Sequence, residues 1–190
     1  MISRKVWGIP LHILLPSVCL FSIAAFFGLA LIVEHQSDLR LIAEIDRTSS
    51  ELQSTGTEIA SIKDGNLQGM NDYISAYAQI EPLQTKYDHE LEQLIALYRG
   101  AQDRSSHRSA MSKWFYGKHH PKTWEDMSEI IALVQAISAV NKREISVVRA
   151  MASLPEPERI QFWHQEFMPL SAQEQALREQ LLAAGRRGSQ

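Results

Sequence analysis

The chain divides into one continuous apolar run and a longer region in which apolar residues recur every three or four positions. The run comprises the 28 residues from Val6 to Val33, which contain no Asp, Glu, Lys or Arg. About 20 apolar residues in a helix cross the hydrocarbon core of a bilayer. We therefore predict a single transmembrane helix at residues 13–33, preceded by a short N-terminal segment at residues 1–12.

The charges beside this run predict its direction across the membrane. Arg4 and Lys5 precede it, whereas Glu34 and Asp38 follow it. Because basic flanks stay on the cytoplasmic side, we expect a signal-anchor with a cytoplasmic N-terminus. In a bacterium this is a single-pass protein of the inner (cytoplasmic) membrane with its main domain in the periplasm. The Gly-Leu-Ala triplet at 28–30 also suits a signal-peptide cleavage site, so cleavage of the run stays open.

The region after the run has helical periodicity throughout, and it predicts an all-α fold. The expected helices cover residues 34–64, 67–99, 124–153 and 157–184. At 1.5 Å per residue they are roughly 42–49 Å long. Four helices of similar length with short connections favour an antiparallel, up-down four-helix bundle. Residues 34–184 are thus predicted to form one extracytoplasmic helical-bundle domain, followed by a basic tail at residues 185–190.

Prolines and glycines are expected to interrupt or end these helices. Pro82 should kink or split the second helix, and Gly100 should close it. Pro169 should kink the fourth helix, which then restarts at a capping box formed by residues 171–174. Gly185 is the expected C-cap of that helix.

The apolar stripes predict the core-facing positions. In the first helix Ile45, Leu52 and Ile59 recur every seven residues, as in a coiled coil. The residues four positions after the first two are Ser49 and Gly56, which are too small for a tight coiled-coil seam. The second helix carries four tyrosines on its stripe, Tyr73, Tyr77, Tyr87 and Tyr98, which we expect to fill the core.

One polar residue interrupts the stripe of the third helix. Asn141 either specifies register or lines a small cavity, or it lies at the edge of the stripe with its amide bonded to backbone.

The stretch at residues 103–122 combines a net charge of +4 with three consecutive aromatic residues. In an upright bundle this connection returns to the membrane, where cations beside aromatic rings suit anionic headgroups or a partner protein. The predicted contact residues are Arg104, Arg108, Lys113, Trp114, Phe115, Tyr116, Lys118 and Lys122. The alternative is a solvated loop whose aromatic side chains pack under the end of the bundle.

Two weaker patterns concern metals and helix pairing. His119 and His120 are neighbours in this loop, and His164 and Met168 are four residues apart on a predicted helix. His107 is near the first pair, but neighbouring histidines lack the i, i+4 spacing that presents both rings to one ion. No carboxylate or cysteine completes the second pair nearby in sequence, so no metal or other cofactor is predicted. Within the apolar run, Ala24 and Gly28 form a small-xxx-small pair that lets two transmembrane helices approach closely.

Composition excludes several classes of protein. The 190 residues are 45% hydrophobic with a net charge of −3, and the single cysteine, Cys19, rules out an internal disulfide framework. The sequence has no HExxH, no ExxH pair, no Gly-rich phosphate loop and no GxSxG motif. We therefore predict a protein that is not an enzyme, and its extracytoplasmic domain is not expected to bind nucleic acid.

Two functions are consistent with this pattern. The first is a membrane-anchored accessory or scaffold subunit that docks on a membrane protein complex, or forms a homodimer, through its transmembrane and bundle helices. The second is a periplasmic helical domain that senses a ligand or a metal. Because no second span follows the bundle in this sequence, we expect such a domain to signal through a partner protein.

Overall fold

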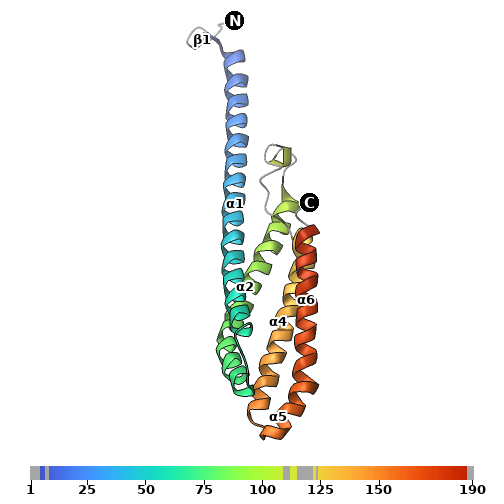
Figure 1. The fold of residues 1–190 in the computed structure, drawn as a ribbon. Coiled ribbons are helices and arrows are strands. Elements are labelled where there is room, and N and C mark those ends of the chain that lie inside the picture. The colour runs from blue at the N-terminus through green and yellow to red at the C-terminus, as the bar shows by residue number, and fades with distance from the viewer. Residues whose placement is uncertain (1–4, 7–8, 109–111, 115–121, 123, 188–190) are drawn as a thin grey trace. The chain divides into compact units, whose positions relative to one another are not determined.

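The computed structural model describes residues 5–6, 9–108, 112–114, 122 and 124–187, with backbone alone at 5–6, 9–21, 23, 126 and 187. Its helices are α1 (Leu11–Lys63), α2 (Met70–His107), α4 (Trp124–Ala152), α5 (Glu156–Phe162), the π-helix η1 (Trp163–Phe167) and α6 (Met168–Arg187) (Figure 1). Two short strands, β1 (Lys5–Val6) and β2 (Ile9–Pro10), pair antiparallel. The predicted all-α fold class is confirmed.

The chain forms two compact units. Unit 1 contains residues 1–42 and 107–121, and unit 2 contains residues 43–106 and 122–190. Among the described residues of either unit, no helix is both long enough and apolar enough to cross a bilayer. The predicted span at residues 13–33 includes the side chains of residues 13–21 and 23, which lie outside the described residues.

Unit 2 is a bundle of antiparallel helices, so the predicted helical bundle is confirmed. Contacts between α2 and α4 run in opposite directions, because Glu81 pairs with Arg149 whereas Asp88 pairs with Lys142. α4 and α6 lie side by side and are joined through α5 and η1 (Figure 1). One buried cluster links four elements, and its members are Ile59, Tyr77, Ile80, Ile145, Val148, Met151 and Phe167.

The buried face of α1 differs by one position from the predicted seam. Ile45, Leu52 and Ile59 are buried as expected. The buried positions between them are Thr48 and Thr55, each one residue before the predicted position. Thr55 satisfies its hydroxyl locally by donating to the carbonyl of Glu51, so it can be buried within the stripe. The small residues have another use: a Cβ at Gly56 would lie 3.2 Å from Cε2 of Tyr87, so glycine lets that ring approach α1.

Of the two outcomes predicted at Pro82, a split of the second helix is wrong, because α2 is continuous from Met70 to His107. Pro82 lies on the exposed face, as does Ala78, whose carbonyl the proline leaves without its helical donor. Gly100 does not end the helix, since the core continues past it: Ala101 is fully buried. Residues 103–107 are therefore helical rather than part of a loop.

The fourth segment also departs from the prediction. Pro169 lies in the first turn of α6, where a missing N–H is tolerated, and the irregularity comes earlier, in η1. There the backbone N–H of Met168 donates to the carbonyl of Trp163, five residues back. The predicted capping box at residues 171–174 lies inside α6, and α6 runs through Gly185 to Arg187. The C-cap and the start of the tail were therefore placed too early.

Candidate functional site

The last turn of α1 carries a lysine that binds three side chains of unit 2. Lys63 Nζ donates to Glu144 Oε2 at 2.5 Å, to Glu174 Oε2 at 2.7 Å and to Asn141 Oδ1 at 2.8 Å. An ammonium group has three N–H donors, so all of them are used. The Lys63 side chain is only 12% exposed, and that of Glu144 is completely buried. This charged group therefore lies in the interior of the bundle and joins α1 to α4 and α6.

Two further side chains complete the cluster. The Tyr77 hydroxyl donates to Glu144 Oε2 at 2.9 Å. Arg178 donates from Nε and Nη2 to Glu174 Oε1, at 3.0 and 2.7 Å. Two cations thus face two carboxylates. The remaining oxygen, Glu144 Oε1, is buried and has no hydrogen-bond partner among the residues that the structure describes.

The two carboxyl groups titrate in opposite directions. Burial raises the pKa of Glu144 above its usual range, despite the nearby Lys63 ammonium. Burial also acts to raise the pKa of Glu174, but Lys63 and Arg178 together hold it below its usual range. Burial, together with the neighbouring Glu144, raises the pKa of Tyr77 far above that of free tyrosine. Tyr77 is therefore a neutral hydrogen-bond donor to Glu144.

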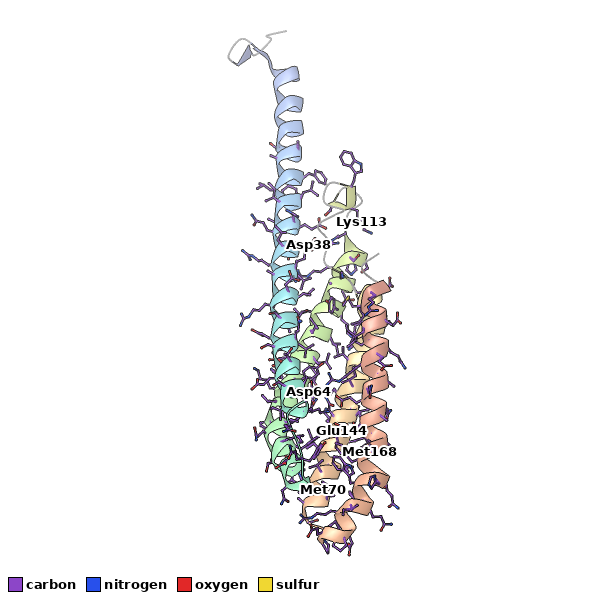
Figure 2. All side chains as sticks on the ribbon, viewed as in Figure 1. Asp38, Asp64, Met70, Lys113, Glu144 and Met168 are labelled. Atoms are coloured by element: carbon purple, nitrogen blue, oxygen red, sulfur yellow. The ribbon has the colours of Figure 1, made fainter. Side chains whose placement is uncertain are left out.

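Beside this cluster lies a pocket of about 430 Å³. Four aromatic side chains line it: Tyr73, Tyr77, Trp163 and Phe167. Its charged lining consists of Lys63, Asp64, Glu174 and Arg178. Figure 2 labels Asp64 and Met168, which both line the pocket, and Glu144 beside it. Pockets of roughly 300–1,000 Å³ with an apolar lining and a few polar groups are typical of small-molecule sites.

The four aromatic residues of the lining, Tyr73, Tyr77, Trp163 and Phe167, form an aromatic wall, and this wall depends on the π-helix. Trp163 and Phe167 are the first and last residues of η1, and their rings stack with centroids 4.0 Å apart. Tyr73 meets Trp163 edge-on at 4.5 Å, and Tyr77 meets Phe167 edge-on at 5.5 Å. Single π-helical turns occur frequently at functional sites. The contacts hold the wall together between α2 and η1.

Two of the residues predicted from sequence lie at or beside this site. Asn141 is buried and accepts a hydrogen bond from Lys63, and Met168 lines the pocket. His164 is exposed and does not line the pocket, so the proposed pair with Met168 is not assembled there. In the described part of the chain, no three His, Cys, Asp or Glu side chains are placed to hold a metal ion. His119 and His120 lie outside the described residues.

The residues predicted to contact the membrane belong to different units of the chain and differ in exposure. Arg108 is 4% exposed and pairs with Asp38 at 2.6 Å, so it is buried within unit 1 and is not available at the surface. Lys113 and Trp114 are exposed in unit 1, and Trp114 is 79% exposed.

The other predicted contact residues are exposed in unit 2 or are not described. Arg104 and Lys122 are exposed in unit 2. Phe115, Tyr116 and Lys118 lie outside the described residues. In α1, Ala24 is exposed, and nothing lies within 4 Å of where a Cβ of Gly28 would be.

Sequence reasoning missed most of the polar cluster. Glu144 follows Asn141 by three residues, so two polar residues share the buried face of α4. This second polar residue on one apolar face was the feature of the sequence that could have indicated the buried cluster. Glu174 was assigned to a cap instead, and no local pattern marks Lys63, because its partners are 78 to 111 residues away. Tyr73 and Tyr77 were expected only to fill the core.

No protein-family model, curated protein or solved structure matches this chain.

Lys63→Met is expected to lower the free energy of unfolding by about 3–5 kcal/mol, because it leaves Glu144 and Glu174 buried without their shared cation. Urea titration of the full chain in mild detergent measures this loss. Lys142→Met is the matched control, since the Lys142 side chain is 58% exposed and its pair with Asp88 should be worth about 1 kcal/mol or less. Equal losses in the two variants would contradict the structural role of Lys63.

Because of Glu144, the free energy of unfolding is expected to fall as the pH rises above 4.5, which is the ordinary pKa of a glutamate side chain. A raised pKa means that the folded state binds this proton more tightly than the unfolded state does. The stabilisation is therefore complete below 4.5 and is lost as the pH rises through the raised pKa. Glu174 acts oppositely and on the acid side of 4.5, because its pKa is lowered.

Glu144→Gln removes the first of these two titrations. Unfolding free energies measured between pH 4 and 8 should fall less steeply with pH in this variant than in the wild type. Glu58→Gln, at an exposed position of α1, is the control and should follow the wild-type profile. Parallel profiles for wild type and Glu144→Gln would contradict the assignment.

Proposed function

We propose that this protein is a membrane-anchored helical domain that binds a small molecule in the pocket of unit 2 and signals through a partner protein. The observation that carries this proposal is the pocket itself. Its lining comes from α1, α2, η1 and α6, so a ligand there would contact four elements at once. A ligand that favours one arrangement of these helices shifts their equilibrium toward it.

The anchor is proposed from the sequence of residues 13–33. Its support in the structure is the run of large apolar side chains on α1 that are exposed, among them Phe26 (73%), Leu29 (63%) and Val33 (64%). Contiguous exposed apolar surface marks an interaction site or a membrane site. The basic residues before the run and the acidic residues after it favour an anchor in the bacterial inner membrane that holds unit 2 in the periplasm.

A docking role as an accessory subunit is the second candidate. It is favoured by exposed apolar side chains on the last helices, namely Ile160 and Leu182. Such side chains suit contact with another membrane protein, and Ala24 with Gly28 suits pairing of two anchors. Lys113 and Trp114 remain candidates for contact with headgroups or with that partner.

The orientation is tested with reporter fusions after Gln190. A reporter that is active only in the periplasm should be active there, because Arg4 and Lys5 retain the N-terminus in the cytoplasm. Replacing both with Glu, in the same fusion, should reduce the signal. Activity of a cytoplasm-only reporter after Gln190 in the unmodified chain would contradict the proposed location.

Ligand binding is tested on the full chain purified from membranes in mild detergent. A panel of anionic, neutral and cationic small molecules is screened by thermal shift. A binder at 100 times its Kd should stabilise the wild type by about 2.7 kcal/mol. Ser171→Trp fills the pocket and should abolish the shift, whereas Ala172→Trp, on the exposed neighbouring position, should retain it.

The two candidate functions give different outcomes in this preparation. A protein that elutes without other subunits and responds to a panel member supports the sensor. A stoichiometric second subunit together with no response across the panel would favour the docking role instead.

A further inference from the structure

We propose that the ligand of this pocket is a small organic cation, an amine or quaternary ammonium compound with a compact body. This inference rests on the proposed function, because it takes the pocket to be the binding site. It is carried by the charge balance of the lining and by the aromatic wall.

The cations of the lining are neutralised within the protein. Lys63 uses its three N–H donors on Glu144, Glu174 and Asn141, and is only 12% exposed. Arg178 directs two N–H groups to Glu174 Oε1. Neither side chain therefore presents an uncompensated charge to the pocket.

One carboxylate of the pocket lining takes no part in these ion pairs. Asp64 follows Lys63 directly, is exposed, lines the pocket and makes no ion pair among the described residues. The other carboxylate of the lining, Glu174, is bound to both Lys63 and Arg178, so Asp64 is the charged group of the lining that is outside these ion pairs. A carboxylate beside neutralised cations favours a cationic ligand and disfavours an anionic one.

The aromatic wall favours the same class. Ring faces carry the negative part of the quadrupole and attract a cation within about 6 Å of the centroid. The site already contains one such contact, since Lys63 Nζ lies 5.6 Å from the centroid of the Tyr77 ring. Tyr73, Trp163 and Phe167 add three more rings to the lining. Aromatic side chains and a carboxylate on one pocket are a combination that recognises an ammonium group.

Choline is the probe that tests the charge requirement, because it has a water-soluble neutral isostere and a related anion. Isothermal titration of the full chain in mild detergent should show choline binding. The isostere 3,3-dimethylbutan-1-ol should bind at least about tenfold more weakly, and 3,3-dimethylbutanoate should not bind, since a desolvated cation–π contact is worth about this factor or more.

Two variants test the site. Trp163→Leu should weaken choline binding about tenfold, because it removes a ring and keeps apolar bulk, and Asp64→Asn should weaken it about threefold to tenfold. The matched controls are Trp114→Leu and Asp46→Asn, both at exposed positions away from the pocket lining, and these should bind choline as the wild type does. Thermal unfolding without probe establishes that each variant is folded.

Three results would overturn the proposal: equal affinities for choline and its neutral isostere, tighter binding of the anion, or no binding of choline. A folded Trp163→Leu or Asp64→Asn variant with unchanged choline affinity would overturn the assigned residues. If an anion or a neutral compound stabilises the wild type but not Ser171→Trp, the cationic class fails while the sensor function stands. If choline binds as proposed but the reporter fusion places unit 2 in the cytoplasm, the cationic ligand class stands while the proposed periplasmic location fails.

Discussion

The arrangement of the helices in unit 2 depends on one buried ammonium group. Lys63 satisfies its three donors on side chains of α4 and α6, and one of its acceptors, Glu144, is held in turn by Tyr77 of α2. Taking these charges out of water is costly, and the cost is offset only while all the partners stay in place. The end of α1 is therefore fixed against the other helices far more specifically than apolar packing alone requires.

The same cluster gives the pocket its polarity. Glu174 and Lys63 belong both to the ion pairs and to the lining, so a charged ligand would alter the balance that holds α1 to α6. Burial raises the pKa of the Glu144 carboxyl group, and within the described part of the chain one of its oxygens has no hydrogen-bond partner. If a ligand binds as proposed, its charge would act on the helix packing through this cluster, with no need for a large movement.

The sequence predicted the helices better than their ends, and the core better than the site. Periodicity identified many of the buried positions, since Ile45, Leu52 and Ile59 are buried, as are Tyr77 and Tyr98 of the tyrosine stripe. Ends were misplaced where tertiary packing overrides a local signal, as at Gly100, beyond which Ala101 remains in the core. The polar cluster could not be predicted, because a buried lysine is specified only by partners on other helices, and sequence spacing does not show which helices meet.

The π-helix shows how a local irregularity can specify such a site. One additional residue within a helical turn rotates everything after it by about 100° relative to an uninterrupted α-helix. η1 therefore sets which face of α6 meets the bundle: Leu170, Glu174 and Ala184 are buried on it. Phe167, Leu170 and Glu174 lie three and seven residues apart, so they share one face of a regular helix, and the π turn sets how that face is rotated relative to α5. The irregular turn costs regular hydrogen bonding, and the stacked rings and the buried ion pair that it aligns compensate for that cost.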